Sequence, residues 1–267
     1  MSNRTVEYLR FMLAATVVLF GTEAAATPVS VSPTSVALKP GSASELITLQ
    51  NESDTAARFE VSVMNWSESA DGKTNLTPTK DLIVFPTLLE LPARGSKKIR
   101  LGTEHFAAGP EQSYRLVIHE LPQPAAGQNV LEIQVLTNMT LPIFLANDMG
   151  RPKIAIESAS VDNTGTLSFT VVNPGTAHFV LQTAAVTGLG PKGKAFEVAQ
   201  KGWYVLPGGK RTYHVSLAGE PCRQTTELAI KMTTDGPTAE TRVPLPKGTC
   251  RDGLTRFFEP QKAEPAS

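Results

Sequence analysis

Short runs in which apolar and polar residues alternate make up most of the chain beyond residue 26. A period of two places one set of side chains on a buried face and the other in solvent, which is typical of a β-strand. Few segments there show the 3.6-residue period of a helix. We therefore expect strands at residues 44–51, 57–66, 97–101, 113–121, 153–161, 166–173, 178–186, 212–217, 226–234 and 241–245.

Turn-forming residues separate these runs, since they supply the positive φ or the fixed φ that a chain reversal needs. Short strands at this spacing predict an all-β protein built of sandwiches or barrels. The turns are expected at Asp71-Gly72, Asn163-Thr164-Gly165, Asn173-Pro174-Gly175, Pro207-Gly208-Gly209 and Asp235-Gly236-Pro237.

The chain is long enough for two sandwich domains of roughly 100 residues each. A boundary is expected within residues 146–152, after a long apolar strand and before a fresh strand pattern. We assign residues 27–148 to an N-terminal domain and residues 149–258 to a C-terminal domain. The segment from Phe258 onward is rich in Pro, Glu and Ala, so residues 259–267 are expected to form a loose tail.

The first 26 residues are typical of a secretory signal peptide. Two basic residues, Arg4 and Arg10, lead a short apolar run, and the small residues Ala24 and Ala26 suit a cleavage site. A membrane anchor is the alternative, but the run is shorter than the roughly 20 residues that a span needs. We expect cleavage after Ala26, a mature chain that begins at Thr27, and no membrane insertion.

The sequence contains two cysteines, Cys222 and Cys250. Export leads to an oxidising compartment, where an isolated pair usually bonds. Two separate thiols are the alternative to the disulfide that we expect. Closing this loop would contribute roughly 3–4 kcal/mol in the chain-entropy model.

Charge and chemistry exclude several classes of function. The 25 basic and 25 acidic residues balance, so no electrostatic argument favours nucleic acid or an anionic membrane as a partner. No spacing suits a metal site, a nucleophile elbow or a phosphate-binding loop, so we expect no enzyme, no metal and no cofactor. Trp66 and Trp203 could be carbohydrate platforms, but core or rim aromatics are commoner. The histidines are scattered, at His105, His119, His178 and His214.

The segment from residue 130 to residue 145 is too long for an ordinary strand. It would span about 50 Å at 3.3 Å per residue, whereas a typical strand has about 5–6 residues. One interpretation is an over-long edge strand that pairs with another chain. The other is two collinear strands that both serve their own core, and the pattern alone does not separate the two. One face is almost entirely apolar, with Leu131, Ile133, Val135, Thr137, Met139, Leu141 and Ile143.

Several ordered motifs resemble the periplasmic chaperones of the chaperone–usher pilus pathway, the PapD-like family. The most similar segment is YRLVIHELP at residues 114–122, and VSPTSVALKPG at 31–41 resembles the family's first strand. Residues 66–102 and GWYVLPGGKR at 202–211 resemble the archaic branch. The resemblance implies two immunoglobulin-like β-sandwich domains in a boomerang arrangement.

The resemblance also implies a function. Such a chaperone inserts strand G of its first domain into a pilin subunit that lacks its last strand, and an outer-membrane usher later releases the subunit. The donor residues would be Leu131, Ile133, Val135, Thr137 and Met139. The alternative is a secreted structural or adhesive sandwich subunit of a surface fibre.

One departure from the family concerns the anchoring of the subunit's C-terminal carboxylate. The best-known branch uses an Arg in the first strand and a Lys in strand G, and these positions fall on Ser35 and Pro142 here. Neither residue supplies a positive charge. Arg100 and Arg115 are the candidate anchors instead, because arginine suits a bidentate grip on a carboxylate.

Overall fold

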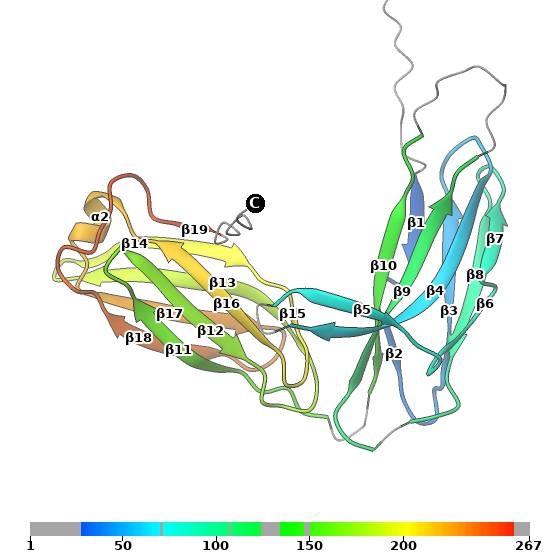
Figure 1. Ribbon diagram of the computed structural model, residues 1–267, viewed down its shortest axis with the longest axis horizontal. Coiled ribbons are helices and arrows are strands. Elements are labelled where there is room, and N and C mark those ends of the chain that lie inside the picture. The colour runs from blue at the N-terminus through cyan, green and yellow to red at the C-terminus, as the bar shows by residue number, and fades with distance from the viewer. Residues whose placement is uncertain (1–27, 70–71, 107, 124–133, 147–149, 259–267) are drawn as a thin grey trace, which may run out of the picture.

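Two β-sandwiches form the protein, as the strand pattern predicts (Figure 1). The computed structural model describes residues 28–69, 72–106, 108–123, 134–146 and 150–258. The predicted signal peptide, the tail 259–267, Leu131 and Ile133 lie outside the described residues. No described helix is long and apolar enough to cross a membrane.

The first sandwich packs a four-stranded sheet against a six-stranded sheet. The four-stranded sheet has the order β1 (Val29–Ser32), β3 (Ser44–Asn51), β8 (Ser96–Gly102) and β6 (Ile83–Phe85). The six-stranded sheet has the order β2 (Val36–Leu38), β10 (Asn138–Leu145), β9 (Gln112–Leu121), β4 (Ala57–Glu68) and β5 (Thr74–Pro78), with β7 (Leu88–Leu91) also paired to β4.

The second sandwich uses the strands from β11 onward. One sheet has the order β11 (Ala155–Val161), β12 (Thr166–Val172), β16 (Lys210–Ser216) and β19 (Arg256–Phe258). The other has the order β14 (Gly193–Lys201), β13 (Phe179–Gly190), β17 (Glu227–Thr234) and β18 (Ala239–Pro244), with β15 (Tyr204–Val205) paired to β13. The short helix α2 (Gly219–Arg223) carries Cys222, which forms the predicted disulfide with Cys250.

Each sandwich buries its own apolar core because the inward residues of its strands alternate with outward polar ones. The largest buried side chains of the first core include Phe59, Leu116 and Ile118, and those of the second include Phe169 and Phe179. A separate small cluster of Trp66, Phe144 and Leu206 draws residues from both sandwiches. The sandwiches are therefore two packing units joined at an apolar junction.

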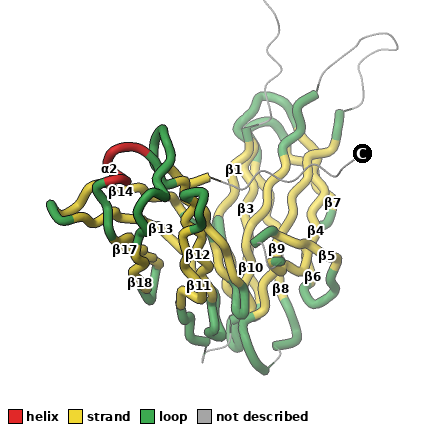
Figure 2. Tube along the Cα trace, turned by 60° about the vertical axis from the view of Figure 1, so that its left-hand side comes forward, coloured by secondary structure: helices red, strands yellow, loops and turns green. Residues whose placement is uncertain are grey.

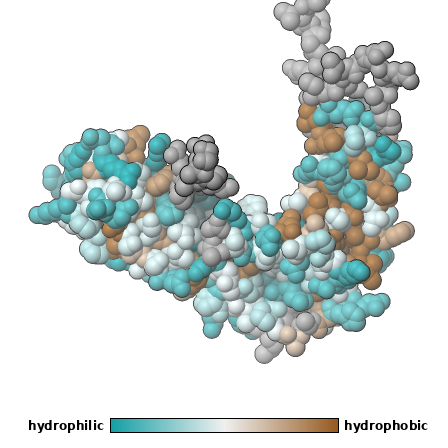
Figure 3. Space-filling view, in the orientation of Figure 1, coloured by the Kyte–Doolittle hydropathy of each residue, from teal (hydrophilic) through white to brown (hydrophobic). Residues whose placement is uncertain are grey.

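The two sandwiches meet at an angle, which gives the predicted boomerang shape (Figures 1 and 2). The space-filling view shows the hollow between the two arms (Figure 3). β10 lies on the side of the first arm that faces this hollow (Figure 1).

The expected strands agree with the observed ones apart from their ends. Strand β10 is shorter than predicted: residues 134–137 are not in a strand, and residues 130–133 are outside the described part of the chain. Phe258, at which the segment rich in Pro, Glu and Ala begins, ends strand β19, which pairs with β16 in register. The prediction also missed β14 and the short edge strands, whose lengths or compositions lack a clear period of two. It missed the short helix α2 as well.

Candidate functional site

Strand β10 has an edge that its own sheet covers only in part. It pairs with β9 along its whole length, from Asn138 to Leu145. On the other side β2 pairs only with Ile143, Phe144 and Leu145. Within the described part of the chain, the edge of β10 from Asn138 to Pro142 therefore has no strand beside it.

This open edge arises because the N-terminal segment changes sheet. β1 pairs with β3 in one sheet, whereas β2, four residues further on, pairs with β10 in the other. β2 has only three residues. An open apolar edge of this kind is a template for pairing with another chain.

The apolar row on one face of β10 passes from the core towards solvent. Leu141 and Ile143 are buried in the first core, and Met139 packs against it partly buried. Thr137 is half-buried, and Val135 is 45% exposed. Of the predicted donor residues, the structure thus describes Val135, Thr137 and Met139, and it shows Val135 as an exposed apolar side chain.

Residues 134–137 stay beside the end of β9 without forming a strand. The Glu120 amide donates to the Thr137 carbonyl (3.0 Å), and the Thr137 amide donates to Oε2 of Glu120 (2.8 Å). Further along, the side chain of Gln134 exchanges hydrogen bonds with the backbone of Gln123 (3.1 and 3.2 Å). These contacts continue the β9–β10 register beyond Asn138.

Arg115 lies in strand β9 and is enclosed by aromatic rings from both sandwiches. Its guanidinium carbon is 3.6 Å from the centre of the Trp66 ring, 5.6 Å from that of Tyr204 and 5.8 Å from that of Trp203. The residue is only 5% exposed. Ring stacking covers the faces of a guanidinium, whereas its N–H groups lie in the guanidinium plane and point outward, where a planar acceptor can bind.

Among the described residues, no carboxylate forms an ion pair with Arg115. Burial lowers the pKa of its guanidinium from the usual value, and the nearby Tyr204 and Glu68 oppose this shift. A buried cation without an acidic partner is costly. An anion that reaches Arg115 would therefore be bound in partly desolvated surroundings, where a charge-assisted pair is strong.

The register connects Arg115 to the two family anchor positions. Pro142 of β10 is directly opposite Arg115. Since Ile143 is level with Val36 in the parallel β10–β2 pair, Pro142 is level with Ser35. The neighbouring strand β9 therefore carries a positively charged side chain, Arg115, at the level of Ser35 and Pro142.

Arg100, the other candidate anchor, lies on the opposite sheet. It is exposed in β8, between Leu46 of β3 and Phe85 of β6 in register. Both of these neighbours are exposed apolar residues. The structure thus does not bring Arg100 together with Arg115 or with the open edge of β10.

Ion pairs and ring stacking join the site to the second sandwich. Glu68 accepts hydrogen bonds from Arg211 (3.1 Å) and from the Leu206 amide (3.3 Å). Burial raises the pKa of the Glu68 carboxyl, and these two donors oppose that shift. Phe144, within β10, stacks on His178 of the second sandwich with ring centres 3.5 Å apart.

His178 also binds the first sandwich, since its Nδ1 is 2.6 Å from Oε1 of Glu111.

The sequence predicted Trp66 and Trp203 as core or rim aromatics. It did not group them with Tyr204 and Arg115, because strand pairing and the meeting of two domains create that cluster.

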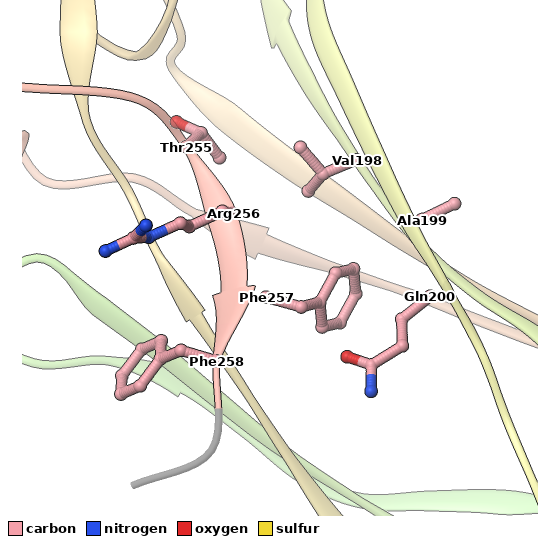
Figure 4. Close-up of a pocket in the computed structure, with 7 residues that line it drawn as sticks. All are labelled: Val198, Ala199, Gln200, Thr255, Arg256, Phe257 and Phe258. Atoms are coloured by element: carbon pink, nitrogen blue, oxygen red, sulfur yellow. The ribbon is translucent and has the colours of Figure 1, made fainter. Parts of the chain in front are cut away.

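A second hollow lies in the second sandwich, between strands β14 and β19 (Figure 4). Phe257 points across it towards β14, whereas Arg256 and Phe258 point the other way (Figure 4). Phe257 packs against the core of its own sandwich. The hollow contains no group of three or more residues that could hold a metal ion, and none occurs elsewhere in the described residues.

The N-terminal part of the chain matches a known family. Residues 28–147 match the model of the pili and flagellar-assembly chaperones, PapD N-terminal domain. A comparison with curated protein sequences finds no match.

Solved structures share the fold of both sandwiches. A chain of the CsuC–CsuE chaperone–tip adhesion subunit complex, from the archaic Csu pili of Acinetobacter baumannii, is 15% identical with a TM-score of 0.53, over 85% of this chain and 100% of that chain. The E. coli chaperone DraB is 20% identical with a TM-score of 0.51, over 83% and 100%.

A chain of the Salmonella enterica complex of SafA pilin with the SafB chaperone is 16% identical with a TM-score of 0.51, over 82% of this chain and 97% of that chain. At these identities the likeness establishes the fold. Residues 28–147, which form the first sandwich, match the PapD N-terminal domain of the pili and flagellar-assembly chaperones, and both sandwiches together share the fold of these solved structures.

Proposed function

We propose that this protein is a periplasmic chaperone that holds pilus subunits by strand addition along β10 and delivers them to an outer-membrane usher. The observation that carries the proposal is the open edge of β10, from Asn138 to Pro142. The apolar row on this strand continues into the segment 134–137 and reaches solvent at Val135.

Strand addition suits these features physically. Backbone groups along an open edge supply hydrogen bonds to an added strand, and alternate side chains fill pockets in the partner. Filling one such pocket with a Leu, Ile or Val side chain contributes roughly 1.5–3 kcal/mol. We therefore propose Leu131, Ile133 and Val135 as donors, with Thr137 and Met139 continuing the row where it enters the chaperone's core.

Proteins of the same fold support the choice of partner. The CsuC–CsuE and SafA–SafB structures are complexes of a chaperone with an adhesion subunit and with a pilin. Membership of the archaic branch, which the motifs at 66–102 and 202–211 suggest, is part of the proposal. The family is one of assembly chaperones rather than enzymes.

Arg115 is the proposed anchor for the subunit's C-terminal carboxylate. A strand that adds to the edge of β10 would end near the level of Pro142 and Ser35, where Arg115 lies on the next strand. No acidic side chain of the described residues pairs with this guanidinium. A chain terminus would supply the missing negative charge.

Export completes the proposal. A signal peptide over residues 1–26, cleaved before Thr27, would deliver the chain to the periplasm, and the Cys222–Cys250 disulfide is typical of such an oxidising compartment. Domain limits at residues 27–148 and 149–258 are part of the proposal, and the change of sheets between β10 and β11 supports a limit in this region.

The test is Val135→Asp, with Gln134→Asp as its matched control, in cells that co-express a pilin subunit. Because Val135 is 45% exposed, the purified variant should melt within a degree or two of the unmodified protein. It should nevertheless hold no subunit in the periplasm, since a carboxylate cannot enter an apolar pocket unpaired.

Gln134→Asp should hold the subunit normally, because its side chain belongs to the opposite face of the segment. Normal subunit binding by Val135→Asp would refute the proposed donor strand. A fibre subunit would also be found outside the cell after fractionation, whereas the chaperone should stay soluble in the periplasm.

A further inference from the structure

We infer that Trp203 of the second sandwich contacts the side chain of the last residue of a bound subunit, next to the carboxylate that Arg115 holds. The inference rests on the proposed function and adds a second recognition element to it. It makes the subunit's terminal side chain, apolar or aromatic, part of what the chaperone recognises.

Trp203 is an exposed aromatic residue in a place where exposure has no evident structural reason. It lies between β14 and β15 and is 48% exposed. One neighbour is Tyr204, whose ring meets it edge-on with centres 5.6 Å apart at 86°. Large exposed aromatic side chains are enriched at protein interfaces, where one face of the ring becomes buried on binding.

The position of Trp203 is held by its backbone. Its carbonyl accepts a hydrogen bond from the Leu181 amide (2.9 Å). A Cβ at the preceding residue, Gly202, would lie 2.3 Å from the Leu181 carbonyl oxygen, so only glycine allows the chain to approach β13 this closely. The indole is thus presented from a fixed backbone, which lowers the entropy lost when a partner binds.

The distance to Arg115 decides which part of a partner would reach the indole. The centre of the Trp203 ring is 5.8 Å from the guanidinium carbon of Arg115. In a C-terminal residue the carboxylate and the side chain branch from the same Cα. A carboxylate held by Arg115 therefore brings that side chain within reach of Trp203.

The chemistry of the surroundings favours an apolar or aromatic terminal residue. The rings of Trp66, Tyr204 and Trp203 surround the guanidinium. Glu68, whose charge acts on Arg115, is already engaged with Arg211. A glycine terminus would keep the carboxylate pair and leave the exposed face of Trp203 uncovered.

The two arms of the boomerang would then recognise one residue together. Arg115 belongs to the first sandwich, and Trp203 belongs to the second. The proposed donor residues between 131 and 139 would contact the length of the subunit's groove, whereas the Arg115–Trp203 pair would recognise where the subunit's chain ends.

The test compares two versions of one pilin subunit, one ending in Leu and one ending in Gly. Each is co-expressed with the unmodified chaperone, with Trp203→Ala or with Leu254→Ala. Leu254 is a suitable control because it is an 83% exposed apolar residue of the same sandwich. The measurement is the dissociation constant of each purified complex.

Trp203→Ala should weaken the complex with the Leu-ended subunit about tenfold, which is the effect of one lost aromatic contact. The Gly-ended subunit should bind to Trp203→Ala and to the unmodified chaperone about equally. Leu254→Ala should change neither complex, and Trp203→Phe should recover most of the lost affinity.

Two outcomes would overturn the inference. One is unchanged binding of the Leu-ended subunit by Trp203→Ala, and the other is an equal loss for both subunits, as a general loss of stability would produce. Failure of the proposed function is distinguishable, because then the unmodified chaperone would hold neither subunit.

Discussion

The open edge of the first sandwich and the corresponding edges of the second are built differently. The uncovered part of β10 continues into an apolar row that reaches solvent at Val135. In the second sandwich, edge strand β14 exposes mainly polar and charged residues, such as Lys194, Glu197 and Gln200. Phe257 of β19 fills part of the hollow between β14 and β19 (Figure 4).

This difference shows that an open apolar edge is not required by the fold. Polar edge residues blunt unwanted pairing, and the second sandwich uses them. It is also closed by a disulfide between α2 and the segment after β18. The first sandwich keeps the open edge of β10, which can pair with another strand. Such an edge is expected where a partner covers it.

The largest effect is expected where the apolar row is buried. Ile143→Asp would place an unpaired carboxylate at a position that is 0% exposed, so the free energy of unfolding should fall by about 4–5 kcal/mol. Urea denaturation of the free protein measures the change. Val135→Asp, on the same row, should lower the free energy of unfolding by less than about 0.5 kcal/mol. Equal losses at the two positions would show that the whole row packs into the core of the first sandwich.

Removal of the disulfide should affect only the second sandwich. The double variant Cys222→Ser, Cys250→Ser should lose about 3–4 kcal/mol of stability, because the unfolded chain gains loop entropy. Subunit holding in the periplasm should not change, since the open edge belongs to the first sandwich. Reduced holding by a variant that is still folded would contradict this division of roles.

Arg115→Ala should weaken the subunit complex by about 1.5–3 kcal/mol, as expected for hydrogen bonds to a charged group. Arg100→Ala is the matched control, because Arg100 is exposed on the opposite sheet, and it should change the affinity by less than about 0.5 kcal/mol. Titration of purified complexes measures both. Equal effects at the two positions would remove Arg115 as the specific anchor.

The smallest effect concerns pH. Burial raises the pKa of Glu68 in the folded protein, so the unfolded chain loses this proton at a lower pH than the folded one. The contribution of Glu68 to stability is therefore present below the unfolded pKa and is lost as pH rises through the folded pKa. In urea denaturation from about pH 4 to pH 8, unmodified protein should lose stability relative to Glu68→Gln as pH rises. A difference that stays constant over this range would contradict the shift.

Local patterning accounts for much of the fold. The strand at residues 44–51 agrees with β3 at both ends, because its inward residues Ile47 and Leu49 alternate with outward ones. The disulfide was predicted from two cysteines in a chain that was expected to be exported. Strand β14 was missed because its burial alternates weakly along an exposed edge.

Sequence alone determined the all-β class, the two sandwiches, the disulfide pair and the unusual apolar row, since alternation and turn residues act over a few neighbouring positions. Only the tertiary structure decided that β2 covers just the end of β10, and that Arg115, rather than Arg100, lies level with Ser35 and Pro142. It also brought Trp66, Tyr204 and Trp203 around one guanidinium. These facts depend on strand register and on contact between two sandwiches, which join residues far apart in the sequence and leave no local pattern.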